Sequence, residues 1–191
     1  GNRTINIFTT LIRIAAVLSL PLLAFTIWTL FFQNDKKAPV EMAQNEITWQ
    51  NIHSPVGMRS HIVLPDGSNL WLNAGSEVKY SIPFTRENRE VELSGEAFLD
   101  VVKNEQSPFV VKTGNAEVEV LGTQFNVNAY PQTEQIQVAL KEGKVKFRFA
   151  GDEGTMKYCE LQPNDFMEFD KENKTAICEN TNIEKYIAWH Q

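Results

Sequence analysis

The sequence predicts a mainly β protein, an antiparallel β-sandwich or jelly-roll-like roll preceded by one transmembrane helix. Two observations lead to this fold class. Ile14–Phe32 is a run of nineteen residues without a charge, close to the roughly 20 that cross a hydrocarbon core. From Ile52 onward, β-type runs alternate with turn residues about every ten positions, a spacing typical of sandwiches and barrels rather than of βαβ units.

Positive charges border the apolar run on both sides, with Arg3 and Arg13 before it and Lys36 and Lys37 after it. This near balance means that the positive-inside rule does not settle the orientation of the helix. A cleaved signal peptide is the alternative interpretation. The run is long for a signal peptide and no small-residue cleavage site follows Phe32, so we favour a membrane anchor.

The patterning divides the chain into five segments. The residues that follow the helix are polar and irregular, as in a juxtamembrane tether. The β-type runs end shortly after Cys178. We therefore expect a juxtamembrane stub (1–13), a transmembrane helix (14–32), a tether (33–51), a β domain (52–180) and an exit linker (181–191).

Alternation of apolar and polar residues marks the strands of the β domain. It is clearest in residues 89–93, 116–120 and 135–140. Turn residues separate the strands, and we expect turns at 65–68, 141–144, 151–154, 163–165 and 171–173. In the first two turns, Gly67 and Gly143 would supply positive φ.

The same alternation predicts which side chains fill the core, because residues two apart on a strand point to one face. The expected buried residues are Val63, Leu64, Leu72, Val91, Leu93, Phe109, Val111, Val118, Val120, Phe125, Val127, Val138, Leu140, Val145 and Phe147.

Composition and motifs argue against several classes of function. The net charge of −6 and pI near 5.2 oppose nucleic-acid binding, which normally needs a basic face. The three histidines, His53, His61 and His190, include no close pair of the kind that holds a metal in a β-barrel, and no nucleotide or hydrolase motif occurs. We expect no metal and no cofactor.

Two carboxylate pairs have the composition of a glycosidase site. They are Glu90 with Glu92 and Glu117 with Glu119. Each pair alternates with apolar residues on a predicted strand, so we interpret both as solvent-facing surfaces.

Cys159 and Cys178 are the only cysteines, and both fall in the last β meander. A disulfide between them is one possibility. Two reduced, buried cysteines are the other, because the sequence does not show whether their Cα atoms come within bridging distance.

Several sequence blocks, in order, resemble the FecR proteins, inner-membrane regulators of extracytoplasmic-function sigma factors. The resemblance covers roughly residues 54–189, and five blocks in one order are specific where a single turn motif would not be. The blocks are 64–68 with 72–76, 89–101, 108–113, 120–127 followed by Tyr130, and 140–145.

The resemblance implies a role in signal relay. The N-terminus would be cytoplasmic and the β domain periplasmic. An outer-membrane TonB-dependent transporter would contact the periplasmic part, and regulatory proteases would then release the sigma factor. FecR proteins also carry a cytoplasmic anti-sigma domain and a short C-terminal domain that this sequence does not include, so we expect it to be a fragment.

The resemblance also implies a candidate self-cleavage site, since some FecR proteins cut themselves at a Gly-Thr bond in the block that holds Gly122 and Thr123 here. A Thr hydroxyl beside a strained peptide can attack the preceding carbonyl to give an ester that water opens. The simpler interpretation is that Gly122 allows a bend and Thr123 is a good strand residue. No other catalytic residue is predicted, and self-cleavage would not be enzymatic turnover.

Two other classes of function stay open. A membrane-anchored carbohydrate-binding module could use Trp49, Trp71 or Tyr80 as stacking platforms. Trp71 argues against this, because it lies between Leu70 and Leu72 directly after a tight turn and at least one face of that strand must be buried. An exported enzyme is the weaker alternative, since no catalytic constellation occurs.

Overall fold

The computed structural model describes residues 3–32, 47–85, 88–114, 116–151 and 155–191. The chain divides into two compact units, of which the second is Ile47–Gln191. Helix α1 (Arg3–Phe32) makes up the described part of the first unit. Its Leu11–Phe31 stretch is long and apolar enough to cross a membrane, with a mean hydropathy of 2.1. Pro21 lies inside α1 and does not end it.

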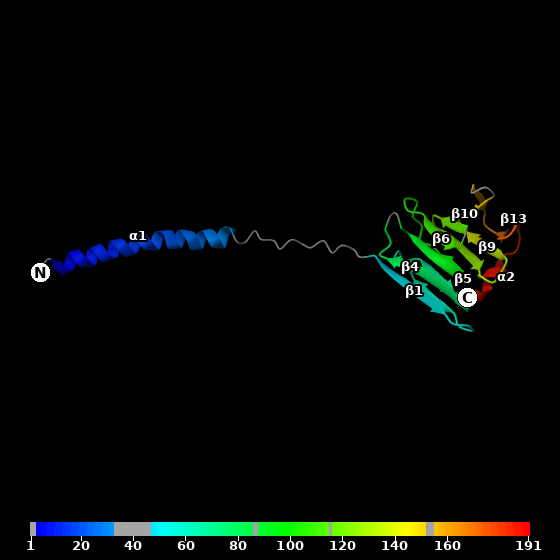
Figure 1. Cartoon of the computed structure of the whole chain (residues 1–191), viewed down its shortest axis with the longest axis horizontal. Coiled ribbons are helices and arrows are strands. Elements are labelled where there is room, and N and C mark those ends of the chain that lie inside the picture. Colours follow the sequence, from blue (N-terminus) through cyan, green and yellow to red (C-terminus); the bar gives the residue numbers. More distant parts are fainter. Residues whose placement is uncertain (1–2, 33–46, 86–87, 115, 152–154) are drawn as a thin grey trace. The chain divides into compact units, whose positions relative to one another are not determined.

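The second unit is built from β strands and ends in two short helices (Figure 1). The strands are β1 (Thr48–Ser54), β2 (Ser60–Val63), β3 (Asn69–Leu72), β4 (Ser76–Ile82), β5 (Glu90–Asp100), β6 (Phe109–Thr113), β7 (Ala116–Val120), β8 (Gln124–Ala129), β9 (Gln135–Glu142), β10 (Val145–Ala150), β11 (Met156–Leu161), β12 (Asp165–Asp170) and β13 (Thr175–Asn180). The mainly β prediction is confirmed. Residues 33–46 of the expected tether lie outside the described residues, whereas residues 48–51 belong to β1 and not to a tether.

Strand β5 joins the two halves of the sheet. Its first half pairs with β4 and β6, and its second half pairs with β3 and β8. The change occurs at Gly95, whose φ is +113° and whose Cα lies so close to Ser76 that a Cβ would come within 2.3 Å of the Ser76 Oγ. Only glycine fits this bend. The β5–β6 pair is parallel, so the sheet is not purely antiparallel as predicted.

The two halves of the sheet enclose one apolar core. Phe147 on β10 and Phe169 on β12 meet across it, with ring centroids 5.4 Å apart. The predicted core is confirmed except at Val63, which is 64% exposed, while its neighbours Ile62 and Leu64 are buried. Because side chains alternate along a strand, Val63 must point away from the core when Ile62 and Leu64 point into it.

The prediction of an exit linker at 181–191 is wrong. Residues Glu184–Ile187 form α2 and Ala188–His190 form a short 3-10 helix, η3. Ile183 and Ile187 are buried against the side of the sheet that faces away from the main core, together with Phe98, Ala139 and Phe166. Phe98, Ala139 and Phe166 form an apolar patch on β5, β9 and β12, and Ile183 and Ile187 of the C-terminal segment cover this patch.

We predict that Ile187→Ala destabilises the β domain. Ile187 is fully buried, and truncating such a side chain to Ala costs about 2–5 kcal/mol. The free energy of unfolding is measured by urea titration of the full chain in detergent micelles, with near-UV circular dichroism as the signal. Glu184→Gln, at an exposed position of the same helix, is the matched control and should leave the midpoint unchanged; equal midpoints for both variants would contradict the packing of α2.

Candidate functional site

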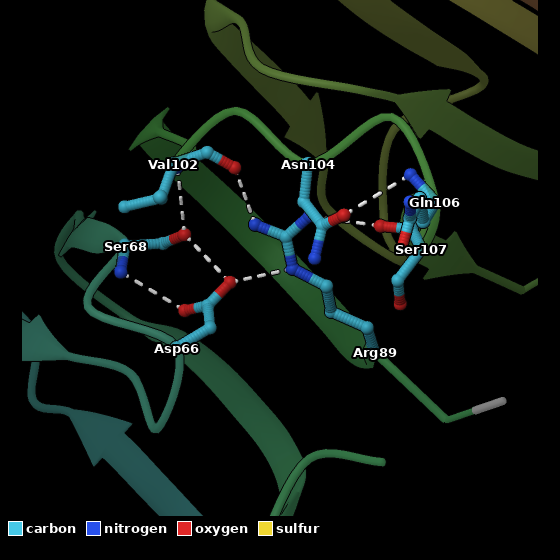
Figure 2. Close-up of polar contacts among 7 residues, drawn as sticks. All are labelled: Asp66, Ser68, Arg89, Val102, Asn104, Gln106 and Ser107. Carbon is cyan, nitrogen blue, oxygen red and sulfur yellow. Dashed lines mark hydrogen bonds and ion pairs between the residues drawn. The ribbon is translucent and has the colours of Figure 1, made fainter. Parts of the chain in front are cut away.

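Arg89 holds the centre of a buried polar cluster (Figure 2). Its side chain is only 4% exposed, and its Nε donates to the Oδ2 of Asp66 at 2.7 Å. The two terminal nitrogens donate to the backbone oxygens of Ser107 and Val102. The guanidinium also lies over the ring of Phe109, 5.4 Å from its centroid. A buried charge is tolerated when it is paired and hydrogen-bonded in this way.

The partner carboxylate belongs to the tight turn between β2 and β3. Asp66 accepts hydrogen bonds from the backbone nitrogen and the hydroxyl of Ser68, at 2.9 and 2.8 Å. The Ser68 hydroxyl in turn accepts from the backbone nitrogen of Val102 at 3.0 Å. The turn, the start of β5 and the loop after β5 are therefore fastened together through one ion pair.

The loop after β5 also fastens the predicted Gly122–Thr123 site. The backbone nitrogen of Val101 donates to the oxygen of Thr123 at 3.0 Å, and that of Asn104 donates to the oxygen of Leu121 at 2.7 Å. A Cβ on Gly122 would come within 2.5 Å of the Lys103 Cα. Glycine is required at position 122 because two backbone segments approach closely there.

The candidate nucleophile, the Thr123 hydroxyl, is buried and already donates a hydrogen bond. Thr123 is 3% exposed, and its hydroxyl donates to the backbone oxygen of Lys144 at 3.0 Å. Gly143, with φ of +94°, packs so closely that a Cβ there would lie 2.7 Å from the Gly122 oxygen. A cavity of about 770 Å³ opens beside this turn.

Attack on the Gly122 carbonyl carbon would require the Thr123 hydroxyl to leave the Lys144 oxygen and transfer its proton to another group. In the structure the hydroxyl instead links the residue just before β8 to the turn before β10. Self-cleavage at this bond stays a prediction.

The carboxylate pairs are neutralised across strands, as expected of a solvent-facing surface. The ion pairs are Glu90–Lys112 at 2.7 Å, Glu92–Lys79 at 3.5 Å, Glu117–Arg148 at 3.2 Å and Glu119–Arg148 at 2.7 Å. The hydrogen bond to Glu90 raises the pKa of Lys112. Such cross-strand pairs stabilise a sheet surface.

The histidines belong to ring stacks or to an edge strand. His61 stacks on Trp71 at 4.7 Å, His190 stacks on Phe98 at 3.7 Å, and His53 lies on β1. No group of three His, Cys, Asp or Glu side chains that could hold a metal ion occurs among the residues the structure describes.

The aromatic residues considered as sugar platforms do not form one surface. Tyr80 is buried at 5% exposure. Trp71 is half-buried between His61 and the rings of Phe98 and His190. Trp49 is 45% exposed, and the Lys79 ammonium lies over its ring. A stacking platform needs open ring faces, which Tyr80 and Trp71 lack.

The two cysteines, far apart on the sheet path, come together in space. Cys159 on β11 is half-buried, Cys178 on β13 is exposed, and both thiols are free. The two side chains are hydrogen-bonded to each other. Burial, and next the neighbouring Cys178, raise the pKa of the Cys159 thiol to about 12.

Sequence reasoning missed the Arg89 cluster as a site. Arg89 and Asp66 lie 23 positions apart, and each looks like an ordinary residue beside a strand or in a turn. Their presence in the first two family-like blocks was the available signal, but nothing in the spacing says that they pair.

We predict that Asp66→Ala destabilises the domain by about 3–5 kcal/mol, because it leaves the Arg89 charge buried without its counter-ion. Urea unfolding of the full chain in detergent measures the change. Glu105→Ala is the matched control, since it breaks the exposed Lys103–Glu105 pair, which should contribute little. A loss for Asp66→Ala no larger than that of the control would refute the central role of the cluster.

The self-cleavage prediction is tested with Thr123→Ala and Thr123→Ser. If the hydroxyl attacks, the unaltered chain and Thr123→Ser yield two fragments that separate after Gly122, whereas Thr123→Ala stays intact. Intact-mass spectrometry of the purified chains identifies the new ends, and circular dichroism checks that each variant folds. Fragments from Thr123→Ala, or a single intact species from the unaltered chain, would exclude the mechanism.

Comparisons with known proteins agree with the geometry. The family model FecR, described as FecR protein, matches residues 50–146, which is half of the chain. The chain is similar to two crystal structures, at 2.50 and 1.65 Å resolution, of a candidate anti-sigma factor from Parabacteroides distasonis ATCC 8503. Identity is 34% in both cases, and the TM-scores are 0.68 and 0.67.

These matches cover 74% and 73% of this chain and 64% of each of the Parabacteroides chains. A search of curated proteins finds no match. The family match spans the strands and turns that carry the Arg89 cluster and the Gly122–Thr123 turn. The chain therefore belongs to the FecR protein family.

Proposed function

We propose that this chain is part of a single-pass inner-membrane anti-sigma regulator. Its β domain lies in the periplasm and relays a signal from an outer-membrane TonB-dependent transporter to a cytoplasmic extracytoplasmic-function sigma factor. The observation that carries the proposal is a FecR domain that follows a helix able to cross a membrane. The chain spans 64% of the length of the anti-sigma candidates that it resembles, so the activity of the whole protein is part of the proposal.

In this proposal the β domain acts as a receiver and not as a catalyst. In the Arg89 cluster, the polar side chains of Asp66, Ser68 and Arg89 form hydrogen bonds that connect a turn, a strand and a loop. The transporter binds the β domain, regulatory proteases cut the chain near the membrane, and the sigma factor is released from a domain on the cytoplasmic side. The net charge of −6 fits a protein partner and opposes direct contact with nucleic acid.

A membrane-anchored carbohydrate-binding module is the competing proposal, and the aromatic geometry speaks against it. Of the three aromatic residues considered as sugar platforms, only Trp49 is exposed, at 45%, and the Lys79 ammonium lies over its ring. One exposed ring gives little area for stacking a sugar.

The relay is tested by crosslinking the intact gene product in its native host and purifying it through a tag on the β domain. We expect mass spectrometry to identify a small sigma factor and an outer-membrane transporter. The matched control is the same gene product with residues 47–191 deleted and the tag moved next to the helix. Because the helix and everything before it are kept, the control should retain the sigma factor and lose the transporter.

Two outcomes would contradict the proposal. Capture of the transporter by the control would mean that the β domain does not receive the signal. Absence of both proteins together with a bound glycan would favour the carbohydrate-binding module.

A further inference from the structure

The two cysteines lie on the strands at the two ends of the main strand path. That path runs β11-β10-β7-β6-β5-β8-β9-β12-β13, and β1, β2, β3 and β4 branch from it at β5. Strand β5 bends at Gly95 and so joins the two halves on one side of the core. On the opposite side the path starts with β11 and ends with β13, and each of these strands has a single paired neighbour among the described residues.

The strand registers turn both thiols toward the core. Cys159 lies directly opposite Phe147, and Cys178 lies directly opposite Met167. Residues opposite each other in an antiparallel pair share one face of the sheet. Phe147 and Met167 are fully buried, so both cysteines project to the inner side of their strands, where their side chains are hydrogen-bonded to each other.

We propose that Cys159 and Cys178 are a covalent modification site, where one intramolecular disulfide joins β11 to β13. The bond closes the strand path into a ring, with β5 as the junction on one side and the disulfide as the junction on the other. The persistence of the bond in the cell rests on the proposed function, because a disulfide needs an oxidising compartment such as the periplasm. The formation of the bond in the purified chain does not depend on that location.

The bond forms by exchange with a disulfide donor, either a small molecule or a protein. The Cys178 thiolate attacks one sulfur of the donor disulfide and stays bonded to it as a mixed disulfide, while the other donor sulfur leaves as a thiolate and takes up a proton. The Cys159 thiolate then attacks the Cys178 sulfur, and the remaining donor sulfur leaves as a second thiolate that takes up a proton. Two protein thiols and one donor disulfide become one protein disulfide and two donor thiols, so the donor is reduced as the protein is oxidised.

The structure orders these two steps. Cys178 is exposed and Cys159 is half-buried, so a donor reaches Cys178 first. The high pKa of Cys159 also makes it the poorer thiolate source for attack on a donor in solution. Once Cys178 carries the donor, Cys159 is the neighbouring thiol that can attack the mixed disulfide.

The closed ring should stabilise the strands at the open side. The bond links residues on either side of β12, which constrains the unfolded chain. It also pins two edge strands, and edge strands with unpaired backbone groups are prone to pair with other chains. Met156, Tyr158 and Ile177 are exposed on these strands, so fraying there would increase the apolar surface available for aggregation.

The test uses the full chain in detergent micelles, reduced and then equilibrated with oxidised glutathione. We expect peptide mapping without reductant to recover a Cys159–Cys178 crosslinked peptide from monomeric chain, with no thiol left to alkylate. Adding reductant should then lower the Tm by about 5–10 °C. The single variants Cys159→Ser and Cys178→Ser are the matched controls, and the Tm of each should not respond to reductant.

Three results would overturn the site: thiols that stay free in oxidised glutathione, a glutathione adduct on Cys178 that never resolves, or disulfides only between chains. A parallel arm alkylates whole cells before lysis and maps the same peptide. A bond found in cells supports the site and the oxidising compartment together. A bond that forms with glutathione but is absent in cells would overturn the periplasmic placement and leave the site standing.

Discussion

The structure depends on the desolvated guanidinium of Arg89. A charge at 4% exposure is stable only if every donor that leaves water finds an acceptor, and here the acceptors come from two separate places, the carboxylate of Asp66 and the backbone oxygens of the loop after β5. The hydrogen bonds to Arg89 therefore fix the position of that loop. The same loop donates to the backbone of Leu121 and Thr123, so the ion pair also helps to position the family-like block 120–127.

A second set of hydrogen bonds fixes the backbone at the bend of β5. The Ser76 hydroxyl accepts from the backbone nitrogen of Glu96, directly after Gly95, and the Tyr130 hydroxyl donates to the backbone oxygen of Ala74. The family-like blocks thus contain residues that allow β5 to bend and neighbouring loops to pack closely.

Much of the fold could be predicted because it follows from short-range patterns. Alternation located the strands and nearly the whole core, and its one failure, Val63, came from assigning two adjacent residues to the same face. The parallel β5–β6 pair, the Arg89–Asp66 contact and the meeting of the two cysteines are long-range contacts, for which spacing along the chain carries no signal. The C-terminal helices were missed because a four-residue helix is too short for a 3.6-residue period to appear; what holds it is an apolar patch on the sheet.

Both ends of the β domain connect to β5. At the N-terminal end of the domain, β1 pairs with β4, which pairs with the first half of β5. At the other end, Trp189 donates to Asn126, which donates to Glu96 in the second half of β5, and Glu96 also accepts from Asn73. In the proposed relay, a signal received at the C-terminal helices would therefore reach β1 through β5. A buried polar network whose members are all hydrogen-bonded makes the elements that it links rigid, so in the proposed relay β5 would connect the two ends of the domain as one rigid element.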